Sequence, residues 1–135
     1  MKLRLTCTTI ALFLVALPLA GCAGGGAEIE GVTWTVTGSS ISSSDLGAFG
    51  ITAIFEDDTV GGRGGVNSYS APYDLRGSSL EIGTVTQTEI AGPPDAMAAE
   101  NAYFALLGEV GGYSLEGDTL TLLDAEGNEL LILER

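Results

Sequence analysis

The sequence predicts an α+β fold that is mainly β, in which about eight short strands form a small antiparallel, barrel-like sheet and one helix packs on it. Segments such as 33–37 and 119–123 alternate large apolar with polar or β-branched residues, which is the period of a half-buried strand. Residues 96–107 are instead rich in alanine, leucine and methionine, which favour a helix. A glycine-rich stretch over 61–73 has the composition of a crossover between strands.

The first residues of the chain predict export. Residues 1–21 have the pattern of a signal peptide, with a basic start, an apolar segment over 5–17 and small residues before Cys22. The sequence Leu-Ala-Gly-Cys at 19–22 is similar to a bacterial lipobox, which implies that Cys22 becomes the first residue and carries lipid. The alternative is an ordinary secretory signal that leaves Cys22 as a free thiol.

Three regions are therefore expected: a lipoprotein signal peptide over 1–21, a flexible glycine-rich linker over 22–29, and one folded domain over 30–135. We expect the protein to be exported and anchored to the bacterial cell envelope, because more than one acyl chain on Cys22 gives stable attachment. The membrane is thus an expected partner through this lipid. The chain has two cysteines, and the other one lies in the signal peptide, so no internal disulfide is expected.

The charge of the chain restricts its partners. Five basic and 18 acidic residues give a net charge of −13, and removal of Lys2 and Arg4 with the signal peptide leaves −15. Nucleic acid is excluded as a partner, because phosphates bind basic surfaces. Anionic lipid would also repel this domain, so attachment has to come from the lipid on Cys22. The acidity is typical either of an ordinary exported protein or of a high-salt habitat.

Further strands are expected where apolar and β-branched residues lie between glycine, proline or acidic turns. The expected extended segments are 33–37, 51–55, 68–74, 80–82, 85–90, 113–116, 119–123 and 129–133. The expected turns are 56–59, 75–78, 116–118 and 124–128. Trp34 should anchor the core, and Tyr69 and Tyr73 should share one face of their strand. Pro72 predicts an edge or a bulge, because proline lacks an N–H.

The helix is expected to begin after Gly92-Pro93-Pro94, with Asp95 as its cap, and to run over 96–107. Its buried face should follow spacings of three and four residues. The residues expected on that face are Ala99, Tyr103, Leu106 and Val110.

An ordered series of motifs resembles the META domain, a family that includes heat-inducible envelope lipoproteins of bacteria. The series contains Gly-x-x-Gly-Gly-x-Asn-x-Tyr at 61–69, Glu-x-x-Tyr-Phe-x-x-Leu at 100–107 and Leu-x-Gly-Asp-x-Leu-x-Leu-x-Asp at 115–124. The resemblance covers residues 30–134. It is carried by Trp34, Phe55, Gly64, Gly65, Asn67, Tyr69, Thr88, Glu100, Tyr103, Phe104, Leu107, Leu120 and Leu122. It implies structural roles for Trp34, Gly64, Gly65, Asn67, Tyr69 and Glu100.

The chain departs from the family at two positions. The family commonly has cysteines where this chain has Val66 and Gly92. If those cysteines are paired in relatives, the closed loop would stabilise them by roughly 3 to 4 kcal/mol. Their joint absence is consistent with a lost crosslink, for which we expect Val66 to compensate by packing.

The residue inventory predicts no catalytic, cofactor or metal site. The chain has no histidine, and after processing it has no lysine. It also lacks the Gly-x-Ser-x-Gly elbow of serine hydrolases, so we expect no enzyme activity. Arg63 beside the glycines could bind an anion, but backbone geometry is the favoured interpretation. Two groups of carboxylates could bind a cation, yet neither has calcium-loop spacing, and solvated turns are favoured. These groups are Glu56, Asp57 and Asp58, and Asp124, Glu126 and Glu129.

Asn67 is expected to be a buried polar bracket across the crossover instead of a surface turn residue, because a rigid crossover supplies backbone partners.

Two functions remain open. The first is a non-catalytic envelope lipoprotein that binds an envelope protein partner or supports the envelope under stress, as the resemblance implies. The second is a carrier for a small apolar ligand inside an eight-stranded barrel. A filled interior would favour the first, and the expected fillers include Trp34, Ile54, Phe55, Tyr69 and Phe104.

Overall fold

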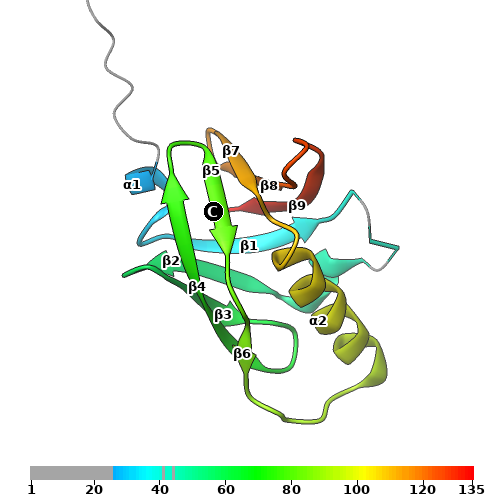
Figure 1. Cartoon of the computed structure of the whole chain (residues 1–135). Coiled ribbons are helices and arrows are strands. Elements are labelled where there is room, and N and C mark those ends of the chain that lie inside the picture. The colour runs from blue at the N-terminus through cyan, green and yellow to red at the C-terminus, as the bar shows by residue number, and fades with distance from the viewer. Residues whose placement is uncertain (1–25, 41, 44) are drawn as a thin grey trace, which may run out of the picture.

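The computed structural model describes residues 26–40, 42–43 and 45–135 (Figure 1). The predicted signal peptide and Cys22 lie outside the described residues. Within the part of the chain that is described, no helix has the length and apolar character needed to cross a membrane.

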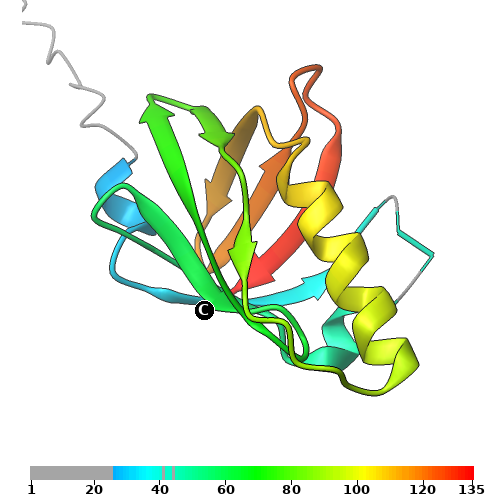
Figure 2. The ribbon, with the colours of Figure 1, turned by 60° about the horizontal axis from the view of Figure 1, so that its bottom comes forward.

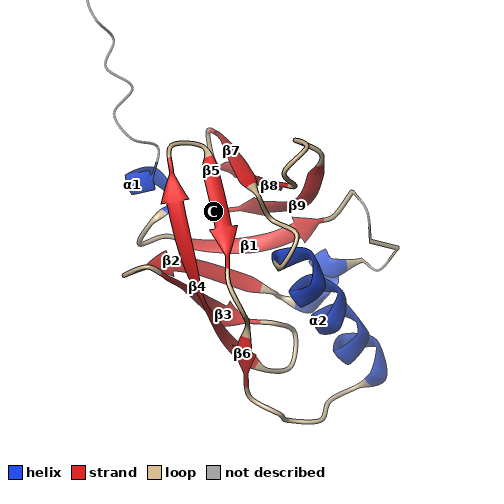
Figure 3. Cartoon of the chain, viewed as in Figure 1, coloured by secondary structure: helices blue, strands red, loops and turns tan. Residues whose placement is uncertain are grey.

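Among the described residues, nine antiparallel strands and one long helix make up the domain (Figure 3). The strands are β1 Thr33–Gly38, β2 Thr52–Glu56, β3 Thr59–Arg63, β4 Ser68–Arg76, β5 Ser79–Ile82, β6 Thr86–Gln87, β7 Gly112–Glu116, β8 Thr119–Leu123 and β9 Glu129–Glu134. The helical segments are α1 Gly26–Ile29, the 3-10 turn η1 Leu46–Phe49, and α2 Pro94–Leu107. The predicted α+β, mainly β fold class is confirmed.

The sheet closes on itself. The strand order is β3-β2-β1-β9-β8-β7-β5-β4-β6, and β3 also pairs with β4, which joins the two ends of that order. The seam between β5 and β7 is short, with Ser79 opposite Gly112 as its one register pair. Helix α2 lies across the opening between the β6 side and the β7–β9 side (Figures 1 and 2). The result is a barrel-like sheet with one helix packed across its opening (Figures 1 and 2).

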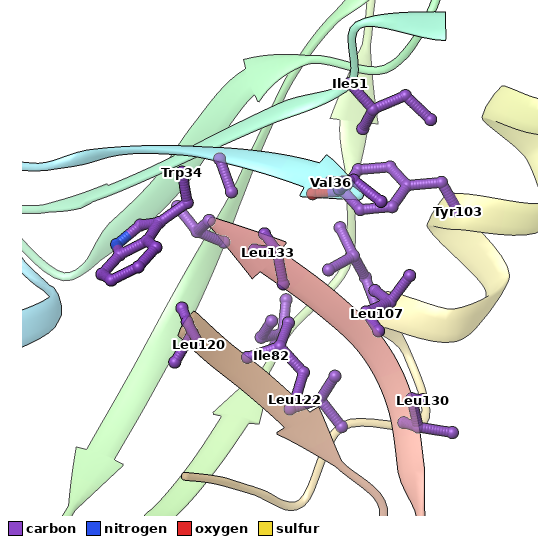
Figure 4. Close-up of a cluster of buried hydrophobic side chains, with 14 of the residues drawn as sticks. Trp34, Val36, Ile51, Ile82, Tyr103, Leu107, Leu120, Leu122, Leu130 and Leu133 are labelled. Atoms are coloured by element: carbon purple, nitrogen blue, oxygen red, sulfur yellow. The ribbon is translucent and has the colours of Figure 1, made fainter. Parts of the chain in front are cut away.

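Alternation along most strands fills the barrel interior, although the adjacent Leu130 and Leu131 of β9 are both buried. In β1, Trp34 and Val36 are fully buried between exposed threonines. Leucines of β8 and β9 face them, and Tyr103 and Leu107 of α2 complete the cluster (Figure 4). Trp34 also donates a hydrogen bond from its indole nitrogen to the Ile29 carbonyl oxygen, 2.9 Å away. Burial of such side chains is the main force that holds a small β-domain together.

Two residues differ from the core predicted from the sequence. Ile29, placed in the linker, is part of the core, and Ile54, placed in the core, is not. Residues 26–29 were expected in a flexible linker, but they form α1, and Ile29 is fully buried. Ile54 was expected inside the barrel, yet its neighbours Ala53 and Phe55 are the buried residues of β2. Because adjacent residues of a strand face opposite sides, Ile54 must point outward when Phe55 points inward.

Pro72 does not lie at an edge, because β3 flanks β4 on one side and β5 with β6 flank it on the other. It does lie opposite a bulge, because the three steps from Ser70 to Tyr73 face four steps from Thr86 to Ile82. Its carbonyl accepts a bond from the Gly83 N–H at 2.8 Å, which places it beside the gap between β5 and β6. In antiparallel pairing the N–H and C=O of one residue point to the same side. The missing N–H of Pro72 therefore falls where no ladder bond is needed.

Helix α2 begins earlier than predicted, and its buried face differs slightly from the predicted one. Its N-terminal cap is Pro93, and Asp95 lies inside the first turn, where its carboxylate accepts a bond from the Ala96 N–H. The buried residues of the helix are Ala96, Ala99, Glu100, Tyr103 and Leu107. Leu106, expected on this face, is half-buried.

Two other segments differ from the predicted bounds. The strand expected over 85–90 shortens to β6, and the turn expected over 75–78 is shorter because β4 continues to Arg76.

Candidate functional site

The glycine crossover between β3 and β4 lies against helix α2. It is a tight reversal, in which the Gly64 N–H donates to the Asn67 carbonyl at 2.7 Å. Gly65 has a φ of +121°, which L side chains rarely adopt. A Cβ at Gly64 would lie 2.5 Å from the Phe104 ring of α2. Both glycines are therefore required, one by backbone conformation and the other by the close approach of the helix.

Glu100 of α2 supports this crossover with its charge. The side chain is 0% exposed, and its carboxylate accepts the N–H groups of Val66 at 2.9 Å and Asn67 at 2.6 Å. It also accepts a bond from the Asn67 amide nitrogen at 2.7 Å. Burial by itself would raise the pKa of Glu100, but these bonds from Asn67 and Val66 outweigh it and lower the pKa below its ordinary value. The carboxylate is therefore buried and ionised.

Asn67 extends the support to a third segment. Its side-chain oxygen accepts the Ile90 N–H at 2.7 Å and the Thr88 hydroxyl at 2.8 Å. Its amide nitrogen donates to the Ile90 carbonyl at 3.1 Å as well as to Glu100. An asparagine amide has two donor hydrogens and two acceptor lone pairs, and all four are used here. Asn67 is thus the predicted buried bracket, with an exposed fraction of 1%.

A pair of tyrosines continues the contact between β4 and α2. The hydroxyl oxygens of Tyr69 and Tyr103 are 2.6 Å apart, and the Tyr69 hydroxyl donates to the Thr52 carbonyl at 3.0 Å. Since Tyr69 has one hydroxyl hydrogen, Tyr103 donates to Tyr69. Burial raises the pKa of Tyr69 to about 12, although the bond from Tyr103 opposes this shift. Burial also raises the pKa of Tyr103 well above its usual value, so both rings are neutral.

Val66 and Gly92, the two positions that differ from the family motif, lie next to each other. A Cβ built on Gly92 would lie 3.3 Å from the Val66 Cβ and 2.6 Å from one of its methyl carbons. Val66 is half-buried. It packs where the expected crosslink of relatives would lie, and the missing side chain at Gly92 leaves room for it.

The charged groups singled out in the sequence lie in turns or at the ends of strands. Arg63 donates a guanidinium bond to the Gly65 carbonyl at 2.9 Å. Asp57 and Asp58 have φ values of 50° and 58° and form the tight turn between β2 and β3. Asp124 accepts bonds from the Asn128 amide and N–H, and those bonds lower its pKa. Among the described residues no group of three or more histidine, cysteine, aspartate or glutamate side chains could hold a metal ion.

The structure therefore brings together five of the residues singled out by the sequence: Gly64, Gly65, Asn67, Tyr69 and Glu100. Trp34 belongs to the core near α1, and Cys22 lies outside the described residues. Sequence reasoning missed the hydrogen bond between Asn67 and Glu100. It also missed the two hydrogen bonds that the Asn67 side chain makes with the backbone of Ile90. One signal was available for Glu100, because it lies three and four residues from apolar positions on the buried face of α2.

Comparisons with known proteins agree with this architecture. An NMR structure of a protein from Burkholderia xenovorans is 20% identical, with a TM-score of 0.62, and the match covers 81% of this chain and 84% of that chain. A second NMR structure is 15% identical, with a TM-score of 0.60, and the match covers 80% of this chain and 92% of the other. These likenesses concern the fold alone. No curated protein matches the chain. The family model of the META domain matches residues 27–135, a span that contains the whole glycine crossover, and the chain belongs to the META domain family.

Proposed function

We propose that this protein is a non-catalytic lipoprotein of the bacterial cell envelope, whose META domain binds a protein partner or supports the envelope under stress. The observation that carries the proposal is that the side chains of the family motif use their polar groups in hydrogen bonds to one another. Glu100 is fully buried, and its carboxylate is occupied by donors from Val66 and Asn67. A general acid or base has to reach a substrate proton, so this arrangement supports bracing instead of catalysis.

The carrier alternative has less support. A carrier needs space inside the barrel, and here large side chains occupy that space (Figure 4). The largest of the fully buried ones are Trp34, Tyr103, Phe55, Ile29, Leu46, Ile51, Leu80, Leu107, Leu120, Leu122, Leu131 and Leu133. Interiors packed in this way have few voids larger than a water molecule.

Attachment to the envelope rests on the sequence around Cys22 and is tested directly. The full chain is expressed in a bacterium with lipoprotein processing, and the membrane-extracted protein is weighed intact. We expect residues 1–21 to be absent and the mass to include a diacylglyceryl group and a further acyl chain on Cys22. Cys22→Ser is the control and should remain an unlipidated precursor. A mature chain with a free Cys22 thiol would contradict the proposal.

Partner binding is tested in intact envelopes with the lipidated protein. Crosslinking followed by purification should recover a protein that is absent from the Cys22→Ser control. Native mass spectrometry of the same sample distinguishes the two functions, because a carrier would retain a small molecule. A bound small molecule without a protein partner would favour the carrier.

A further inference from the structure

Strand β6 and the residues that follow it form an exposed segment, Thr86 to Ala91, which we call the β6 edge. All six residues are exposed. Ile90 is 62% exposed, and it is the one large hydrophobic side chain that is exposed among the described residues. The segment lies at the end of the barrel opposite α1 (Figures 1 and 2).

The backbone of the β6 edge has a free hydrogen-bonding side. Thr88 donates its N–H to the Ser68 carbonyl of β4 at 3.0 Å, so Thr88 faces β4. Because the N–H and C=O groups of successive strand residues alternate in direction, those of Gln87 and Glu89 point away from β4. Strand β6 is also the last strand in the sheet order, so no described strand pairs with it on that side, which faces the opening that α2 crosses (Figures 1 and 2). An open hollow of 310 Å³ lies over the paired strands β4 and β6 and is lined by residues 68–70 and 86–88.

The β6 edge is held rigid by the buried bracket. Asn67 bonds both the N–H and the carbonyl of Ile90, as a neighbouring strand would. Its side-chain oxygen also accepts the Thr88 hydroxyl. Glu100 in turn fixes the Asn67 amide. A partner that binds here therefore orders little of this chain, and the usual entropic cost of immobilising a loop is reduced.

The charge within the β6 edge is negative. Glu89 lies within it and Asp95 follows it, whereas the nearby Arg63, opposite Ser68 on β3, has its guanidinium bonded to the Gly65 carbonyl. A complementary partner carries lysine or arginine beside an apolar residue that covers Ile90. Anionic lipid does not fit this description, because like charges repel.

We propose that the β6 edge is a docking site for an extended segment of a partner protein, which adds a strand along Gln87 and Glu89 and covers Ile90 with an apolar contact. Such strand addition takes its affinity from main-chain bonds and its specificity from alternate side chains. This inference rests on the proposed function, since it names the surface that the partner uses.

The experiment places a photo-crosslinking residue at Ala91 of the full lipidated chain in the producing bacterium. The same residue at Ser114, on the exposed side of β7, is the control position. We expect Ala91 to crosslink to a protein, with the crosslinked peptide containing basic and apolar residues. The crosslink should weaken as the salt concentration is raised, because exposed charges are screened.

Paired variants test the two contacts separately. Gln87→Pro removes the outward N–H and Gln87→Ala keeps it, so the proline variant should lower the Ala91 crosslink roughly tenfold or more and the alanine variant should not. Ile90→Glu should lower it to a similar extent, whereas Ile90→Val should retain it. Thermal unfolding checks that each variant is folded.

Several results would overturn the proposal. They are a crosslink from Ala91 to lipid or to a second copy of the chain, no loss with Gln87→Pro, or no loss with Ile90→Glu. Protein crosslinks from Ser114 but not from Ala91 would refute the β6 edge and leave the proposed function intact. An absence of protein crosslinks from both positions, together with an empty pull-down, would refute the β6 edge and the partner-binding part of the proposed function.

Discussion

Glu100 and Asp124 accept hydrogen bonds from the same kinds of donor in two different settings. Each carboxylate accepts two backbone N–H groups and one asparagine amide, from Asn67 for Glu100 and from Asn128 for Asp124. The pKa of each is lowered. The donors of Glu100 lie 33 or 34 residues away, whereas those of Asp124 lie two to four residues away.

The difference shows what such a cluster contributes to the fold. The Asp124 cluster closes a turn from neighbouring residues, and solvent can replace its bonds. The Glu100 cluster is buried and joins α2 to the crossover and, through Asn67, to the β6 edge. Because a buried donor without a partner keeps its full desolvation penalty, the Glu100 cluster should dominate stability although the local chemistry is the same.

The largest expected effect is the loss of the Glu100 charge. In Glu100→Gln, an amide group replaces one carboxylate oxygen and meets donors from the crossover. We expect the free energy of unfolding in urea to fall by about 4 kcal/mol. The matched variant Asp124→Asn should cost only a small fraction of that amount. Equal losses in the two variants would contradict the contrast between the clusters.

The bracket can also be reinforced covalently. In Val66→Cys with Gly92→Cys, the two Cβ atoms would start near the 3.3 Å separation seen here, and disulfides need about 3.5–4.5 Å. A small backbone shift should allow the bond and raise the free energy of unfolding by about 3 kcal/mol under oxidising conditions. The reduced protein is the control. Failure of the two thiols to pair would show that these segments lie farther apart.

A reciprocal exchange tests the Asn67–Glu100 pair itself. Asn67→Asp alone places two carboxylates together and should destabilise the domain. Combined with Glu100→Gln, it restores one donor and one acceptor across the pair. We expect the double variant to regain about 2 kcal/mol relative to Glu100→Gln. Additive losses in the double-mutant cycle would mean that the two side chains do not interact directly.

The smallest expected effect is on pH dependence. Because the pKa of Glu100 is lower in the folded state than its ordinary value of 4.5, its contribution is complete above that value. It is lost as the pH falls through the folded pKa. The stability of Glu100→Gln should therefore fall less steeply below about pH 4.5 than that of the unchanged protein. Unfolding in urea at several pH values measures both slopes, and parallel slopes would contradict an ionised Glu100.

Features set by neighbouring residues could be predicted from the sequence. Alternation along 33–37 places Trp34 in the core, and the alanine-rich segment after Pro94 forms the helix. The order of motifs indicated the family. The glycines of the crossover indicated that its backbone lies close to another segment. Even the position of Ile54 follows from alternation, since Phe55 beside it has to face inward.

Tertiary structure alone decided which distant segments meet. Nothing near Asn67 in the sequence indicates that Glu100 and Ile90 are its partners, because those contacts depend on how α2 crosses the barrel. The tolerance of Pro72 on an inner strand likewise depends on the gap between two neighbouring strands. The sequence by itself determined the periodicity, charge and family of the chain, which are local properties. The partners of the buried bracket and the free β6 edge required the fold, because hydrogen bonds and exposed edges are set by the segments that pack around them.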